Sequence, residues 1–148
     1  MDNAFSQLEE VMSERAKTAG PVLVLSYPKE GVAKSIPLTP QQMSLLRGKK
    51  IGDEIDASAL GLGQGRIRIT GGSDRAGFPM RPDISGARLV RVLLTKGIGF
   101  HARRKPPSKR KKDRNRRTVD GLRKRVTLRG NVISDEISQI NAVLIPES

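Results

Sequence analysis

The residues best suited to chemistry in this chain are the arginines and lysines of residues 103–129. These 27 residues contain fourteen basic side chains and two acids, Asp113 and Asp120, so their net charge is +12. The whole chain of 148 residues has a net charge of +13, so its remainder is nearly neutral. Such a segment predicts binding to a polyanion, since each contacted phosphate releases condensed counterions and makes the binding salt-sensitive and only weakly sequence-dependent.

Two kinds of partner fit such a segment, nucleic acid and an anionic membrane surface. Basic segments that bind membranes usually come with an amphipathic face or a lipid anchor, and this segment has neither. Nine of its basic residues are arginines, whose planar fork suits phosphate better than a point charge does. We therefore expect nucleic acid, with RNA and DNA both open, and no membrane. With three Phe, one Tyr and no Trp, the chain offers little for the aromatic platforms on which single-strand binders stack bases.

The sequence offers few of the residues and motifs that catalysis would need. The chain has no cysteine, which excludes disulfides, thiolate metal sites and cysteine catalysis and is typical of a reducing cytosol. His101 is the only histidine, and at the edge of a basic run we interpret it as a surface residue rather than as a base or ligand. No P-loop motif occurs, and we interpret the glycines of residues 61–65 as a turn.

An acidic cluster of Asp53, Glu54 and Asp56 is the candidate for a hard cation such as Mg²⁺. We favour a simpler interpretation, a solvated strand end or ion pairs with the neighbouring Lys49 and Lys50. The sequence thus predicts no enzyme, no metal, no cofactor and no small-molecule substrate.

Short strands must position the basic segment. Residues 21–27 and 32–38 flank a Lys29-Glu30-Gly31 turn and predict a hairpin. Thr39 is a helix N-cap, with a proline at the first helical position and a capping-box glutamine, so we expect a short helix that ends before Gly48. Further strands are predicted over residues 49–55, 66–70, 88–95 and 139–145, and an N-terminal helix over residues 3–17.

These elements predict a mainly β fold, a small β-barrel-like domain with a short helix, an N-terminal helical extension and a basic arm that binds nucleic acid. The expected divisions are the extension (1–19), the barrel-like core (20–100), the basic segment (101–130) and a returning strand that completes the core (131–148). The predicted core consists of Val22, Leu23, Val24, Leu25, Ile67, Ile69, Val90, Val92, Leu93, Val143 and Ile145. No run is apolar enough to span a bilayer, and the N-terminus lacks the layout of a signal peptide.

The basic segment is expected to lack structure until it meets its partner. It repels itself and offers only four large apolar residues for burial, Val119, Leu122, Val126 and Leu128. If residues 139–145 return to the sheet, the segment is an arm held at both ends, which costs the fold little because loop closure depends only logarithmically on length.

Several motifs, read in order, carry a family resemblance. They are GKKIGDEID (48–56), ITGGSDRAGFPMRPD (69–83), RVLLTKGIGF (91–100), RGNVIS (129–134) and QIN (139–141). Together they resemble the S6e family, the archaeal and eukaryotic type of the protein numbered six in the small ribosomal subunit, from about residue 21 to residue 145. GGSDRAGFPMRPD is the most specific of them. The resemblance implies a small β-barrel-like domain that binds ribosomal RNA, has no enzymatic activity and supports translation in the cytoplasm beside neighbouring ribosomal proteins.

Departures from the family also shape the expectations. The resemblance does not explain residues 1–19, and residues 118–129 contain extra residues relative to the usual run into RGN. The chain lacks the helical, serine-rich tail of eukaryotic members, so it resembles the archaeal short form and we carry over no regulation by phosphorylation.

The residues predicted to contact RNA are Arg103, Arg104, Lys105, Lys109, Arg110, Lys111, Lys112, Arg114, Arg116, Arg117, Arg123, Lys124, Arg125, Arg129, Arg81 and Lys49. For Arg81, in the GFPMRPD loop, two interpretations stay open, projection toward RNA or bracing of the loop. The alternative function is a free nucleic-acid-binding module, such as an RNA chaperone or a DNA-compacting protein. A third is a protein-interaction domain that recognises an acidic protein.

Overall fold

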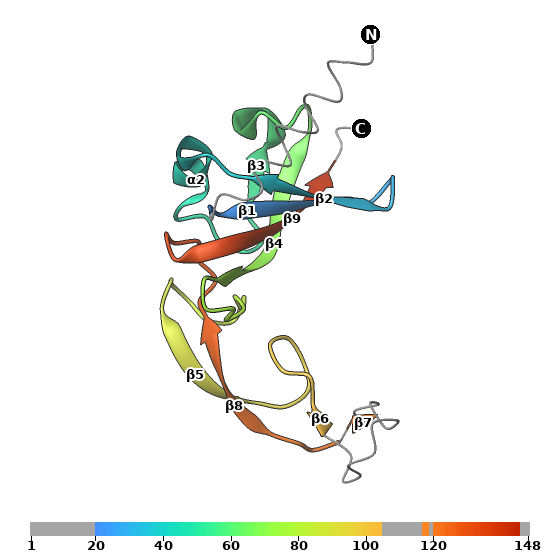
Figure 1. Cartoon of the computed structure of the whole chain (residues 1–148), viewed down its shortest axis with the longest axis vertical. Helices are drawn as coiled ribbons and strands as arrows, with labels where there is room; N and C mark the ends of the chain where they lie inside the picture. The colour runs from blue at the N-terminus through green and yellow to red at the C-terminus, as the bar shows by residue number, and fades with distance from the viewer. Residues whose placement is uncertain (1–19, 105–116, 119, 146–148) are drawn as a thin grey trace.

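A five-stranded sheet and a separate two-stranded ribbon make up most of the computed structural model, which describes residues 20–104, 117–118 and 120–145 (Figure 1). The elements are β1 (Val22–Tyr27), β2 (Val32–Pro37), α2 (Pro40–Leu46), β3 (Glu54–Asp56), the 3₁₀ helix η1 (Ala57–Leu60), β4 (Arg66–Asp74), β5 (Leu89–Leu94), β6 (Arg103–Arg104), β7 (Arg117–Thr118), β8 (Lys124–Arg129) and β9 (Ile137–Ile145). The helix predicted over residues 3–17 lies outside the described residues. Within the described part, no helix is long and apolar enough to cross a lipid bilayer.

The large sheet has the strand order β2-β1-β9-β4-β3. The β1–β2 hairpin confirms the first prediction, and β9 confirms the returning strand. β9 lies at the centre of the sheet, parallel to β1 and antiparallel to β4. The two ends of the basic segment are therefore anchored, because the chain re-enters the sheet after it.

The fold is mainly β with one short helix, as expected, but the expected barrel-like closure is absent from the described sheet, whose edges are β2 and β3. β5, which we expected in the core, pairs only with β8 in a second, two-stranded sheet. The main sheet therefore stays open, and the ribbon extends away from it in Figure 1.

Helix α2 begins and ends as its sequence predicts. The Thr39 hydroxyl accepts a hydrogen bond from the Gln42 backbone N–H, and the Gln42 side chain accepts one from the Thr39 backbone N–H. The helix ends at Leu46, two residues before Gly48, whose φ of 81° lies in the left-handed region. Helix α2 and η1 contribute Met43, Leu46, Ala57 and Leu60 to the core that covers one face of the sheet.

The core differs in its residues from the one that the sequence predicts. Leu23, Leu25, Ile67 and Ile69 are fully buried in it, as expected. The core also includes residues that the prediction omitted: Leu38, Met43, Leu46, Ala57, Leu60, Met80, Ile133, Ile137, Ile140 and Ala142. The alternation of a strand explains the difference for Val22, Val24, Val143 and Ile145, which are half-buried on the other face of the sheet. Val90, Val92 and Leu93 lie on the ribbon instead, where Leu93 is 57% exposed.

The ribbon shows that the end of the basic segment has a structure of its own. Residues 124–129 form β8, whose register sets Val126 opposite Val92 and Leu128 opposite Val90. Such cross-strand apolar pairs stabilise an antiparallel ribbon. Leu94 of β5 and Leu128 of β8 are the buried leucines of the ribbon. The expectation that residues 103–129 lack structure throughout is therefore wrong for β8, and it is also wrong for the short strands β6 and β7.

Gly130 lies where the ribbon joins the sheet, and replacing it by alanine is expected to lower the free energy of unfolding by about 1–3 kcal/mol. An added Cβ would lie 1.9 Å from the carbonyl oxygen of Gly86, a backbone atom that a rotamer change cannot move. Urea unfolding followed by circular dichroism measures the loss. Gly71→Ala is the control, because no described atom lies within 4 Å of its added Cβ; equal effects of the two variants would contradict the prediction.

Candidate nucleic-acid interface

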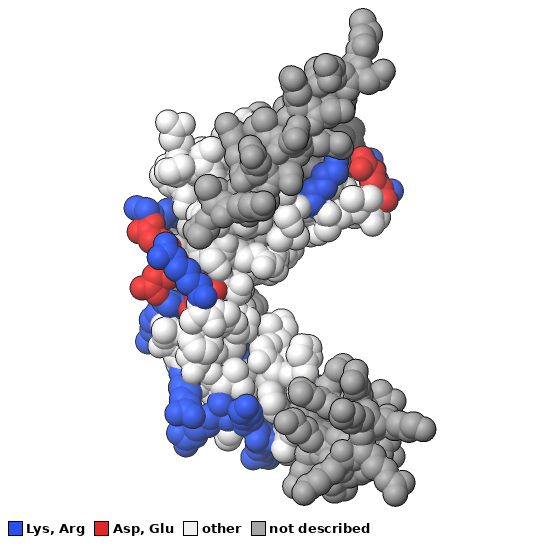
Figure 2. Space-filling view, viewed as in Figure 1, with Lys and Arg blue, Asp and Glu red and all other residues white. Residues whose placement is uncertain are grey.

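Six exposed cations gather on the β5–β8 ribbon. They are Arg88, Arg91, Lys96, Arg123, Lys124 and Arg125, which we call the ribbon cations. Because β5 pairs with β8, with Leu93 opposite Arg125 and Leu94 opposite Lys124, the cations of both strands lie on one narrow ribbon. In Figure 2 blue side chains cover this lower part of the molecule, with no acidic side chain visible between them. Among the described residues of the ribbon and its connections, Asp120 is the only acidic one.

The sheet differs sharply from the ribbon in its charge. The described residues of the sheet and its loops, 20–87 and 130–145, carry nine basic and eight acidic side chains. Several of them are paired, for example Arg47 with Asp135 and Arg68 with Glu54. The positive field of the described part therefore arises mainly on the ribbon.

Half of the ribbon cations were predicted and half were not. Arg123, Lys124 and Arg125 belong to the predicted set, whereas Arg88, Arg91 and Lys96 were assigned to or beside a core strand. A sequence signal for them exists, because no acid occurs between Asp83 and Asp113. The basic region thus begins well before residue 103, although the density of charge is lower there.

The other predicted contact residues lie in different surroundings. Arg103, Arg104 and Arg117 belong to the short antiparallel strands β6 and β7. Lys105, Lys109, Arg110, Lys111, Lys112, Arg114 and Arg116 lie outside the described residues. Lys49 is exposed on the sheet side, in a segment that runs alongside residues 131–133.

Arg81 has the contacts of a loop brace. Its Nε atom donates to the Asp83 carboxylate at 2.7 Å, and its Nη1 atom donates to the carbonyl oxygen of Ile98 at 3.0 Å. These contacts correspond to the bracing interpretation of the two that the sequence left open, and they tie the GFPMRPD loop to the turn after β5.

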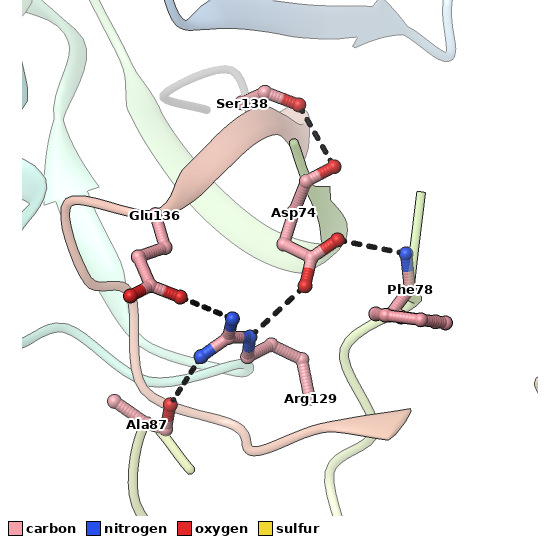
Figure 3. A network of polar contacts seen from close by, with 6 residues as sticks. All are labelled: Asp74, Phe78, Ala87, Arg129, Glu136 and Ser138. Carbon is pink, nitrogen blue, oxygen red and sulfur yellow. Dashed lines mark hydrogen bonds and ion pairs between the residues drawn. The ribbon is translucent and has the colours of Figure 1, made fainter. Parts of the chain in front are cut away.

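Arg129 is buried, with 7% of its surface exposed, and its guanidinium is used within the chain. Its Nε atom donates to Asp74 at 3.1 Å, its Nη1 atom donates to the carbonyl oxygen of Ala87 at 3.1 Å, and its Nη2 atom donates to Glu136 (Figure 3). Asp74, only 3% exposed, also accepts a hydrogen bond from the Phe78 backbone N–H at 2.8 Å. We call these three ionised residues, Arg129, Asp74 and Glu136, the junction triad, because they join the last residue of β8 to the ends of β4 and β9. Arg129 is therefore not a cation that the protein presents to a ligand.

Within the acidic cluster at β3, Glu54 pairs with arginines rather than with the lysines that we expected. Glu54 pairs with Arg68 at 2.6 Å and lies 3.7 Å from Arg66, both on the neighbouring strand β4. The hydrogen bond from Arg68 lowers the pKa of Glu54 below its usual value. Asp53 accepts a hydrogen bond from the Lys50 backbone N–H. Among the described residues, no group of three or more His, Asp and Glu residues is arranged to hold a metal ion.

Comparison with known proteins shows the family to which this sequence is similar. The family model described as "Ribosomal protein S6e" matches residues 22–117, from β1 to β7. The match is shorter than the resemblance suggested: it ends before β8 and β9, and so before residues 118–129, where we expected extra residues.

Curated relatives from archaea extend the comparison. A protein of Methanothermobacter thermautotrophicus is 44% identical over 106 residues, which cover 72% of each chain. One of Methanocella arvoryzae is 42% identical over 122 residues, 82% of this chain and 75% of the relative. One of Methanoculleus marisnigri is 39% identical over 122 residues, 82% of this chain and 81% of the relative. Each is named "Small ribosomal subunit protein eS6". The chain therefore belongs to the S6e family of ribosomal proteins.

Proposed function

We propose that this protein is a structural constituent of the small ribosomal subunit and binds the ribosomal RNA of that subunit through its basic arm, which includes the β5–β8 ribbon. The S6e family consists of structural ribosomal proteins rather than enzymes. Its proposed place is therefore the cytoplasmic ribosome, in contact with ribosomal RNA and neighbouring ribosomal proteins, in support of translation.

The observation that supports RNA binding is the difference in charge between the ribbon and the sheet. The ribbon presents six exposed cations against one acid, whereas the sheet is close to neutral. Each cation that reaches a phosphate releases counterions, so the ribbon is the element that supplies affinity. The sheet contributes orientation, because β8 leads through Arg129 directly into the segment that returns as β9.

Sedimentation of a lysate that contains a tagged copy of the full chain tests the proposal. We expect the protein to migrate with the small subunit in moderate salt and to crosslink to one defined region of its ribosomal RNA. Protein found only in the free fraction, or crosslinks scattered over many RNAs, would favour a free RNA chaperone or a DNA-compacting protein instead. Association that survives nuclease digestion would favour recognition of an acidic protein.

A further inference from the structure

Both phenylalanines of the described residues line the same hollow beside the ribbon. The hollow has a volume of about 400 Å³, and its lining includes Phe78, Pro79, Phe100, Val126, Lys124 and Arg125. The two rings come from separate loops, one after β4 and one after β5. Both phenylalanines are half-buried rather than packed into the core, so they remain accessible.

We infer that this hollow binds one unpaired RNA base, which stacks on Phe78 and Phe100 while Lys124 and Arg125 bind the flanking phosphates. The inference rests on the proposed function and adds to it the kind of RNA structure that is recognised. Unpaired bases in loops and bulges bind aromatic rings by stacking, whereas a base within a duplex does not present its face.

The chemistry of the lining fits a nucleotide. Its lining combines apolar residues with the two cations Lys124 and Arg125, and none of the described residues that line it is acidic. Its volume lies in the range of pockets that hold small organic molecules, about 300–1,000 Å³. The low aromatic content of the chain argues against a platform for several bases, but a site for one base needs only two rings, and here the fold brings two together.

The backbones that carry the rings are fixed before any ligand arrives. Two hydrogen bonds join Phe78 to Asp74: the Phe78 N–H donates to the Asp74 carboxylate at 2.8 Å, and the Phe78 carbonyl oxygen accepts from the Asp74 backbone N–H at 3.0 Å. Phe100 and Gly97 form a reciprocal pair of backbone hydrogen bonds at 3.1 and 3.0 Å. A preorganised site loses less conformational entropy when it binds.

Gly99 holds the second loop against the ribbon. Its φ is +88°, and an added Cβ would lie 2.7 Å from a Leu128 methyl carbon and 3.7 Å from Pro79. The turn therefore packs closely on β8 and on the residue that follows Phe78, which keeps Phe100 at the edge of the hollow.

Two RNA hairpins test the inference with the full-length protein, one with a single bulged 2-aminopurine and one in which the same base is paired. We expect the bulged hairpin to bind roughly tenfold more tightly, an effect within the range of one stacked base. The fluorescence of the bulged base is expected to change on binding, since stacking alters its emission.

Phe78→Leu with Phe100→Leu is the decisive variant, because leucine keeps the apolar packing and removes the ring. It is expected to bind both hairpins with the affinity of the wild type for the paired one, with an unchanged unfolding midpoint. Phe100→Tyr keeps a ring and is expected to retain the preference. Val32→Ala with Leu45→Ala is the control, because both side chains are exposed on the sheet side and neither residue lines the hollow.

The outcomes separate this site from RNA binding in general. Equal binding of both hairpins by the wild type, or a preference that survives the double leucine variant, overturns the base site and leaves the proposed function standing. A wild-type protein that binds neither hairpin nor ribosomal RNA overturns both.

Discussion

Replacing Asp74 by alanine is expected to lower the free energy of unfolding by about 3–5 kcal/mol, the range measured when one partner of a buried ion pair is removed. Asp74 and Arg129 are both buried, and the variant leaves Arg129 with the Ala87 carbonyl oxygen and with one carboxylate, that of Glu136, whose side chain is mostly exposed. The Phe78 backbone N–H also loses its acceptor. Because small domains are stable by about 5–15 kcal/mol, this single change brings the protein close to unfolding.

The rest of the junction triad supplies the controls. Glu136→Gln is expected to cost no more than about 1 kcal/mol, since the Glu136 side chain is 65% exposed and exposed ion pairs contribute little. Asp74→Leu combined with Arg129→Met is expected to recover most of the loss, because apolar replacement of both partners of a buried pair is often neutral or stabilising. Urea unfolding by circular dichroism measures all three variants. If Asp74→Ala costs as little as Glu136→Gln, the junction is not held by this pair.

Neutralising Arg123, Lys124 and Arg125 together by glutamine is expected to lower the slope of log affinity against log salt for ribosomal RNA by about 2–3, since each phosphate contact contributes about 0.7–0.9. The affinity itself is expected to fall by roughly 10- to 1,000-fold in moderate salt, because these hydrogen-bonded contacts are lost together. All three side chains are exposed, so stability is expected to change by less than about 0.5 kcal/mol per residue. Filter binding across a salt series measures the slope.

A matched control removes the same charge elsewhere. Lys29, Lys34 and Arg47 are exposed on the sheet side of the molecule, and their triple glutamine variant changes the net charge by the same amount. We expect its slope to equal that of the wild type. Equal losses in the two triple variants would mean that overall charge, and not the ribbon, determines the affinity.

Local patterns predicted the parts of the fold that neighbouring residues determine. The capping box at Thr39 and the alternation of Ile67 and Ile69 depend on residues two or three positions apart, and both have the expected structure. The returning strand β9 was also predicted, because residues 139–145 follow a stretch of turn residues and end in an apolar run. Closure of the sheet could not be predicted in this way, since it depends on which edge β5 meets, and β5 pairs with β8 across a long connection.

The candidate site likewise has a part that local sequence predicts and a part that depends on distant residues. Charge density located Arg123, Lys124 and Arg125 on the surface that we propose to bind RNA, but it also selected Arg129, which is buried. The difference between Arg125 and Arg129 is not local, because the acids that pair with Arg129 lie 55 residues before it and 7 residues after it. Composition likewise gives the number of aromatic residues but not their distance from one another, so the hollow that Phe78 and Phe100 share could be found only in three dimensions.

The central position of β9 sets an order of events during synthesis of the chain. Residues 137–145 are the shared neighbour of β1 and β4, so those two strands have no common partner until the ribosome has translated residues 137–145. The β1–β2 hairpin can form early, because its contacts are local, whereas the large sheet requires contacts across more than a hundred residues. The basic segment precedes β9 and therefore leaves the exit tunnel before the scaffold is complete. Its charges are thus available to nucleic acid while the sheet that will orient them is still unfinished.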